Sequence, residues 1–215
     1  PNILSCGWHL HQSVVDKATG ANLFQRTTPA PGSTPLDSQH TLSALGEHYL
    51  AGLLAHARGM AVFCTPTVNG FGRFRPNALA PQSVLWGRDN RGAMLRVVGE
   101  AGDPATRIEN RLGEPAANPY LYLASQIHAG MDGVARQLKA PPATDAPYAE
   151  LGPEHRLPTT LGEALDALQA DTTMVNAFGA DFIHYFARIK HSELTRYELA
   201  EDKDDFQRRE YFSRI

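Results

Sequence analysis

The chain has 215 residues, 42% of them hydrophobic, with a formal net charge of −3 and a pI near 6.3. This length and apolar content allow one sizeable core. No apolar run approaches the ~20 residues of a membrane-spanning helix. Two cysteines do not form a disulfide framework. An acidic chain without a lysine-rich stripe is also unlike a nucleic-acid-binding domain. We therefore expect a cytoplasmic protein that binds neither membrane nor nucleic acid.

The segment CGWHLHQS near the start alternates, so that His9, His11 and Ser13 share one face of a predicted strand. Two histidines at this spacing are a weak metal signal, because such residues are often only the polar face of a strand. If the carboxylate of Glu109 lies on a neighbouring strand, the nitrogen and oxygen donors would suit Mg²⁺ or Mn²⁺ better than a thiolate-rich zinc site.

The next elements follow from periodicity and from turn residues. The polar segment 27–37, with PAPGSTP at its centre, predicts a loop, and residues 42–62 repeat apolar side chains at helical spacing after a capping residue, Thr41. Residues 73–81 predict a proline-bounded loop. Strands are predicted over 84–86, 94–98 and 107–112.

Arginine is concentrated in the middle of the chain. Seven of the 16 arginines and no lysine fall between residues 73 and 111. The planar guanidinium grips carboxylate or phosphate with two hydrogen bonds, which lysine cannot do. In an acidic chain this cluster favours a small anionic substrate; its members are Arg73, Arg75, Arg88, Arg91, Arg96, Arg107 and Arg111.

The segment 106–133 places Arg107, Glu109 and Arg111 at strand spacing, hence on one face. Burying three charges is costly unless metal, phosphate or carboxylate partners satisfy them. A salt-bridge ladder on a solvated edge strand is the alternative that this stretch alone leaves open.

The rest of the chain is predicted to be mainly helical. Asn118 and Pro119 are a cap and a first turn, and we expect the helix after them to pack its Tyr120, Leu123, Ile127 and Met131 in the core. Residues 140–156 are rich in proline and alanine and predict connecting chain. Helices follow over 161–168 and 180–197, with Glu193, Arg196 and Glu198 on a solvated face, and the charged run 201–210 predicts another solvated helix face.

Several long motifs, in order along the chain, resemble the C-terminal half of the catalytic domain of the glutamine synthetase family. They are HLHQS, NLF at 22–24, TPTVNGFGRFRPNALAP at 65–81, DNRGAMLRV at 89–97, RIENRLGEPAANPYL at 107–121 and REYFSRI at 209–215. The match runs nearly end to end and is weakest over 140–156. It implies an α+β domain, with a curved, largely antiparallel sheet and helices packed outside.

The resemblance also implies an activity. An ATP-dependent ligase of this family phosphorylates the γ-carboxylate of glutamate and lets an amine displace the phosphate. The matching positions imply that His9 and Glu109 bind a Mg²⁺ or Mn²⁺ ion that bridges the nucleotide phosphates. They place His11 and Ser13 beside ATP, Arg91, Arg96 and Arg107 on phosphate groups with Arg91 also catalytic, and Arg73 and Arg111 on glutamate.

The chain departs from the family pattern at positions that affect substrate choice. Leu4, Ser5 and Trp8 replace residues near the amino-acid end of glutamate, and Leu79 replaces the glutamate of a flap, Gly-Tyr-Glu-Ala-Pro, that helps to bind and deprotonate ammonium. Since leucine cannot accept a proton, we expect an organic amine as nucleophile. The alternatives are a harmless loop change in an ammonium-using enzyme and a catalytically silent scaffold.

The resemblance finally concerns extent and assembly. It covers only the second half of the family's chain, so the N-terminal domain and the other metal-binding glutamates would lie upstream, and we expect residues 1–215 alone to be inactive. Family members form rings whose subunits share active sites, which predicts self-association.

Overall fold

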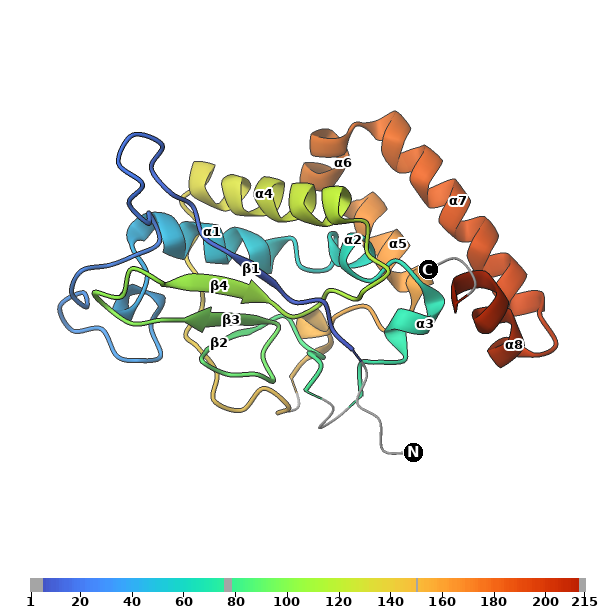
Figure 1. Ribbon diagram of the computed structural model, residues 1–215, viewed down its shortest axis with the longest axis horizontal. Coiled ribbons are helices and arrows are strands. Elements are labelled where there is room, and N and C mark those ends of the chain that lie inside the picture. Colours follow the sequence, from blue (N-terminus) through green and yellow to red (C-terminus); the bar gives the residue numbers. More distant parts are fainter. Residues whose placement is uncertain (1–5, 76–78, 150, 213–215) are drawn as a thin grey trace.

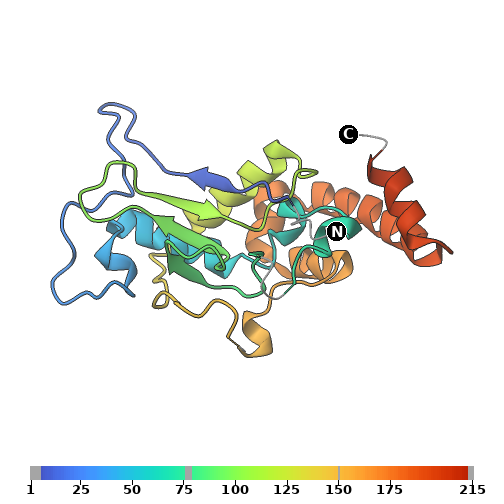
Figure 2. The same ribbon diagram turned by 60° about the horizontal axis from the view of Figure 1, so that its bottom comes forward.

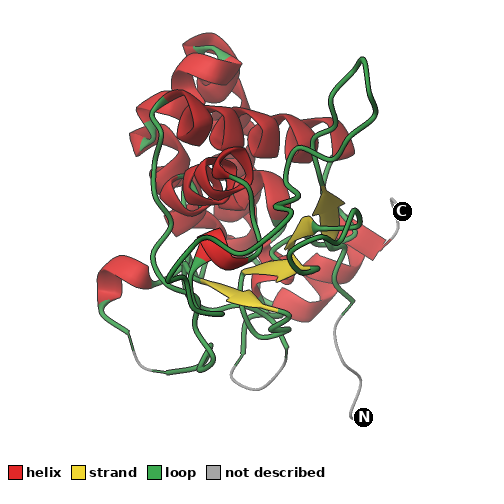
Figure 3. Ribbon diagram, turned by 90° about the vertical axis from the view of Figure 1, so that its left-hand side faces the viewer, coloured by secondary structure: helices red, strands yellow, loops and turns green. Residues whose placement is uncertain are grey.

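The computed structural model describes residues 6–75, 79–149 and 151–212. Four short strands form one sheet in the order β1-β4-β3-β2: β1 (Leu10–Gln12), β4 (Arg107–Asn110), β3 (Leu95–Val98) and β2 (Trp86–Arg88). The central strand β4 is antiparallel to β1 and β3, whereas β2 runs parallel to β3. Most helices gather on one side of the sheet (Figure 3). The predicted α+β class with a largely antiparallel sheet is confirmed.

Helices α1 and α4 lie beside the sheet, and the C-terminal helices α7 and α8 lie at one end of the molecule (Figure 1). Glycines allow α1 and α4 to pack closely, because a Cβ at Gly52 would collide with the Ala129 carbonyl. Figure 2 shows α7 and α8 projecting beyond the sheet layer. The bounds are α1 Ala44–Ala55, α2 Ala61–Cys64, α3 Val68–Phe71, α4 Pro119–Ala135, α5 Leu161–Ala170, α6 Thr172–Phe178, α7 Ala180–Leu199 and α8 Lys203–Gln207, with short 3₁₀ turns η1 Ser38–His40 and η2 Pro153–His155 and a π turn η3 Arg208–Phe212.

The core face of the sheet carries a buried amide network in addition to apolar side chains. Asn110 on β4 donates to Gln126 Oε1 of α4 at 2.7 Å, and Gln12 of β1 donates to the same oxygen at 3.3 Å. Tyr49 of α1 donates to Gln12 Oε1 at 2.9 Å. A fully satisfied buried network rigidifies its surroundings, so these four side chains tie β1, β4, α1 and α4 together behind the sheet.

The first predicted helix was placed correctly but was too long. It begins after Ser43, whose Oγ accepts from Gly46 N at 3.1 Å, and Thr41 is not its cap. It ends at Ala55, a turn over 56–60 follows, and α2 is a separate short helix. The described residues of the predicted loops 27–37 and 140–156 contain no helix or strand apart from η2. Strand β2 begins two residues later than predicted.

The start of α4 was predicted correctly, but its buried face was not. Asn118 Oδ1 accepts from two amides of the first turn, as a cap should. The four side chains assigned to the core are instead exposed, with Tyr120 at 83%, Leu123 at 44%, Ile127 at 54% and Met131 at 50%. The helix buries its small and polar side, because this side packs closely against α1 and the amide network: Tyr122, Ser125, Gln126, Ala129, Gly130 and Gly133.

The C-terminal helices confirm the predicted ranges 161–168 and 180–197, with one error on α7. Glu193, assigned to a solvated face, is only 7% exposed. It accepts from Lys190 Nζ at 2.8 Å and from the Tyr211 hydroxyl at 2.6 Å. The charged run 201–210 is helical and mostly solvated, with Phe206 turned inward. Within the described ranges, no helix has the length and apolar character needed to cross a membrane.

A buried histidine joins three helices away from the sheet. His56, which follows α1, has Nδ1 2.8 Å from Asp171 Oδ2 and Nε2 2.9 Å from Asp132 Oδ2. Burial lowers its pKa, but the hydrogen bonds and charges of the two carboxylates outweigh burial and raise the pKa above its usual value. Arg136 also donates to Asp132 Oδ2, at 2.9 Å.

This cluster predicts a pH-dependent contribution to stability. Because the pKa is raised in the folded state, the stabilisation is complete below the unfolded pKa of about 6.5 and is lost as pH rises through the folded pKa. His56→Gln should therefore lower the thermal midpoint of the full-length protein at about pH 6, equivalent to roughly 1–3 kcal/mol, and less at about pH 9. Melting curves at the two pH values test this, and an equal loss at both would contradict it.

Candidate functional site

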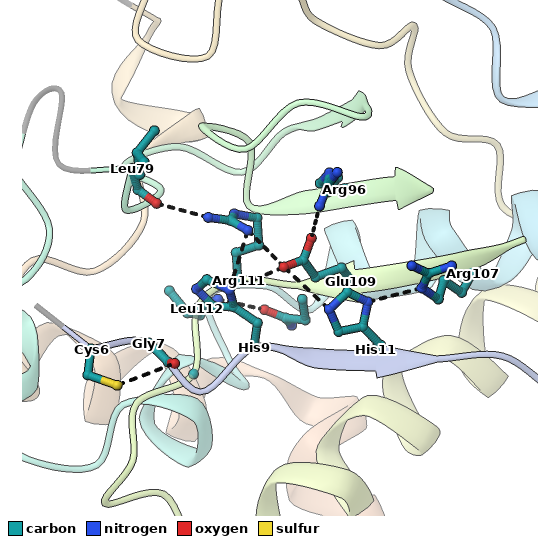
Figure 4. A network of polar contacts seen from close by, with 12 residues as sticks. Cys6, Gly7, His9, His11, Leu79, Arg96, Arg107, Glu109, Arg111 and Leu112 are labelled. Carbon is teal, nitrogen blue, oxygen red and sulfur yellow. Dashed lines mark hydrogen bonds and ion pairs between the residues drawn. The ribbon is translucent and has the colours of Figure 1, made fainter. Parts of the chain in front are cut away.

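Charged side chains line the face of the sheet opposite the amide network (Figure 4). His11, Glu109 and Arg96 are register partners on β1, β4 and β3, so they form one row across the sheet. His9, Arg107 and Arg111 are two residues from members of this row. The predicted strand periodicity is thus confirmed for β1 and β4.

Glu109 lies at the centre and is only 2% exposed. Arg111 Nη1 donates to its Oε1 at 2.7 Å, and Arg96 Nη1 donates to its Oε2 at 3.1 Å. Burial raises the pKa of Glu109, but the hydrogen bond with His9, the charge of Arg111 and the hydrogen bond from Arg96 outweigh it and lower the pKa to about 2. The carboxylate is therefore ionised at neutral pH. The side chain is buried and charge-paired, so a solvated salt-bridge ladder does not describe it.

The two histidines approach the same carboxylate oxygen. His9 Nδ1 lies 3.2 Å from Glu109 Oε1, and His11 Nε2 lies 3.6 Å from it. His11 Nδ1 accepts from Arg107 Nε at 3.2 Å, which leaves the proton of the neutral ring on the Nε2 that faces Glu109. Burial lowers the pKa of His11, against the raising effect of Glu109.

Arg96 has a second carboxylate partner that sequence reasoning missed. Its Nε donates to Asp89 Oδ1 at 2.9 Å, and its Nη2 contacts the same oxygen. Asp89 directly follows β2 and has a left-handed φ of 50°, where non-glycine residues are uncommon. The sequence DNRG at 89–92, which is typical of a turn, was the signal that could have indicated Asp89 as a site residue.

The remaining predicted site residues lie outside the central row. Arg73 is buried, and its guanidinium donates to the main-chain carbonyls of Arg111, Leu112 and Gly113. Arg91 is exposed on the turn between β2 and β3, and Ser13 is exposed just after β1. Their predicted roles toward ATP and glutamate remain predictions.

Leu79 reaches the site through its main chain. Its carbonyl accepts from Arg111 Nη2 at 3.3 Å (Figure 4), and its side chain is 48% exposed. Its φ of 54° is left-handed. The neighbouring Asn77 and Ala78, like Leu4 and Ser5, lie outside the described residues. Arg111 Nε is buried without a hydrogen-bond partner in the described part of the chain.

The donor set fits part of a divalent-metal site. His9 and Glu109 bring an imidazole nitrogen and an ionised carboxylate oxygen to one place, and an ionised carboxylate has lone pairs for more than one partner. The described residues contain no group of three or more histidine, cysteine, aspartate or glutamate side chains that could hold a metal ion. Further ligands would have to come from elsewhere.

Comparison with known proteins identifies the family. Residues 2–209 match the model "Glutamine synthetase, catalytic domain", so the chain belongs to the glutamine synthetase family. It is 43% identical over 220 residues to a gamma-glutamylanilide synthase of Acinetobacter sp, covering 98% of this chain and 42% of that protein. It is 36% identical over 170 residues to a glutamine synthetase of Thermus thermophilus, covering 76% and 38%.

Solved structures agree with the sequence relatives. A structure described as a GmaS/ADP complex aligns with a TM-score of 0.74 at 31% identity, over 96% of this chain and 46% of that one. An apo GmaS structure aligns with a TM-score of 0.73 at 32% identity, over 96% and 44%. The chain therefore spans less than half the length of these relatives.

Proposed function

We propose that residues 1–215 form the C-terminal half of the catalytic domain of an ATP-dependent ligase that joins the γ-carboxylate of glutamate to an organic amine through a γ-glutamyl phosphate. The observation that carries this proposal is the buried, ionised Glu109, held between two guanidiniums and facing two imidazoles. Phosphoryl transfer needs such fixed cations where charge develops on the phosphoryl oxygens. The ADP complex of the structural neighbour supports ATP as co-substrate.

His9 and Glu109 would hold Mg²⁺ or Mn²⁺ on this proposal. When bound, such an ion neutralises phosphate charge and aligns the nucleotide. Glu109 can bind the ion at neutral pH because its pKa of about 2 keeps the carboxylate ionised. Arg96 and Arg111 fix the orientation of this carboxylate. The neutral His11 ring, oriented by Arg107, and Ser13 would lie beside the nucleotide.

The arginines divide into two proposed groups. Arg91, Arg96 and Arg107 would hold phosphate, with Arg91 on an exposed turn where it can close over the transferred group. Arg111 would hold glutamate, which its free, buried Nε supports, because a buried donor without a partner is costly. Arg73 would shape the glutamate site through the loop that carries Arg111.

The proposed amine is aromatic. Leu79 cannot accept a proton or pair with ammonium, whereas its apolar side chain can contact a ring and contributes on the order of 1.5–3 kcal/mol when fully buried. The relative with 43% identity is named for an anilide product, which supports the same class of amine.

An amine panel tests the function. The full-length enzyme, given glutamate, ATP and either ammonium, methylamine, ethanolamine, a polyamine or aniline, should release phosphate with the highest kcat/KM for the aromatic amine. If ammonium gives the highest kcat/KM, the chain belongs to a true glutamine synthetase. If no amine supports phosphate release while the protein is folded, a silent scaffold is the better interpretation.

We also infer that the full-length protein self-associates. The exposed stripe Tyr120, Leu123, Ile127 and Met131 on α4 supports this, because contiguous exposed apolar side chains commonly mark interfaces. Light scattering of the full-length protein should give a multiple of the subunit mass, and a monodisperse monomer would count against the inference.

A further inference from the structure

The segment η3 folds back against α7 and α3 at the end of the molecule farthest from β2 (Figure 1). The Tyr211 hydroxyl donates to Glu193 Oε1 at 2.6 Å and accepts from Val68 N at 3.1 Å. Lys190 Nζ donates to the other oxygen of Glu193 at 2.8 Å. Burial, and then the hydrogen bond with Glu193, raise the pKa of Tyr211. The hydroxyl therefore stays protonated and can donate and accept at once.

Charge pairing fixes η3 in this place. Arg196 on α7 contacts both oxygens of Glu210 with its two terminal nitrogens, at 2.8 and 3.0 Å. The Arg196 guanidinium also lies over the Phe206 ring, 5.6 Å from its centre. A bidentate pair of this kind defines orientation as well as distance. Tyr211, next to Glu210, is thus held toward α3.

The contact with Val68 matters because α3 is a single turn. The first N–H groups of a helix have no partner within the helix. Two of these groups at α3 are satisfied from outside: Thr67 N donates to the buried Glu114 Oε1 at 3.1 Å, and Val68 N donates to Tyr211. Thr67 Oγ also donates to Glu114, at 2.8 Å. Two segments far apart in the sequence therefore hold the first amides of α3: Glu114 binds Thr67 N, and Tyr211 binds Val68 N.

The other end of α3 leads to Arg73. The Arg73 amide donates to Gly70 O at 3.2 Å, and the Arg73 guanidinium donates to the carbonyls that precede Glu114, those of residues 111–113. A displacement of α3 would therefore move Arg73 and, with it, the main chain of Arg111, whose side chain contacts Glu109 and the Leu79 carbonyl.

We propose that Tyr211 is a positioning residue for the glutamate end of the site, acting on Arg73 through the Val68 amide and α3. It touches neither Glu109 nor any residue of the central row. The assignment of that end to glutamate rests on the proposed function, whereas the coupling of Tyr211 to Arg73 rests on the contacts alone.

Tyr211→Phe tests the coupling in the full-length enzyme, because it keeps the ring and removes only the hydroxyl. Hydrogen exchange at the Val68 and Arg73 amides should accelerate by about tenfold, the scale expected for one lost buried partner. The KM for glutamate should rise by about fivefold, while kcat and the KM for ATP stay within about twofold.

Tyr185→Phe is the matched control, since Tyr185 is 65% exposed on α7, the helix that carries Glu193; it should change none of these quantities. Unchanged exchange at Val68 and Arg73 in Tyr211→Phe would overturn the proposal, as would a general fall in thermal midpoint with all kinetic constants altered together. If the wild-type enzyme turns over no substrate, the proposed function fails, and the exchange measurement still decides the coupling.

Discussion

Glu109→Gln is expected to abolish most of the ligase activity, with kcat/KM at least about 10³-fold below wild type. The substitution preserves shape but removes the negative charge that the structure places between Arg96 and Arg111. Two effects add: the carboxamide no longer offers an anionic oxygen to a divalent ion, and Arg111 loses its carboxylate partner while Arg96 keeps only Asp89. The second effect should lower the free energy of unfolding by about 3 kcal/mol.

The measurement is phosphate release by the full-length enzyme together with Mn²⁺ titration. Assays well below the thermal midpoint of the variant separate lost chemistry from lost folding. Glu100→Gln is the matched control, because the Glu100 side chain is 74% exposed just after β3, and it should retain activity. Activity of Glu109→Gln within tenfold of wild type would show that this carboxylate is not part of the reaction centre.

Leu79→Glu should shift amine preference toward ammonium. A carboxylate at this position could accept a proton and pair with a small cation, which leucine cannot do. A hydrogen bond to a charged group is worth about 1.5–3 kcal/mol, so the ratio of kcat/KM for ammonium to that for aniline should rise by about ten- to a hundredfold. Neither side chain is branched at Cβ, so the left-handed backbone of residue 79 should tolerate glutamate about as well as leucine.

Leu36→Glu provides the control for added charge, since Leu36 is a loop residue of similar exposure, 41% against 48%. It should leave the ratio unchanged. The kcat/KM values for ammonium and for aniline must both be measured for each variant. A fall in kcat/KM for aniline alone would also follow from simple damage to the loop. A ratio that does not move in Leu79→Glu would mean that residue 79 does not decide the amine.

Much of the site could be predicted because strand periodicity is a local property. The alternation at His9 and His11 and at Arg107, Glu109 and Arg111 was enough to place each set on one face. Which strands pair is not local, so the row that joins His11, Glu109 and Arg96 had to come from the structure. The parallel β2–β3 pair, joined only by residues 89–94, also departs from the usual long crossover.

The errors concern burial, which depends on partners that the local pattern does not show. The apolar stripe of α4 was assigned to the core, but the opposite side is smaller and lets α1 approach closely. Glu193 was assigned to solvent because a lone glutamate on a helix usually lies there. Its partner Tyr211 is 18 residues away in the chain, and Arg73 similarly finds main-chain rather than anionic partners within the described chain.

The amide network behind the sheet protects the order of the charged face in front of it. Side chains alternate along a strand, so a slip of β4 by one residue against β1 would turn Glu109 into the core and Asn110 outward. Short strands of three and four residues resist such a slip weakly on their own. Asn110 and Gln12 share one oxygen of Gln126, and a slipped strand would leave these buried amides without partners. The buried amides on the core face therefore destabilise shifted strand registers in which His11, Glu109 and Arg96 would no longer be neighbours.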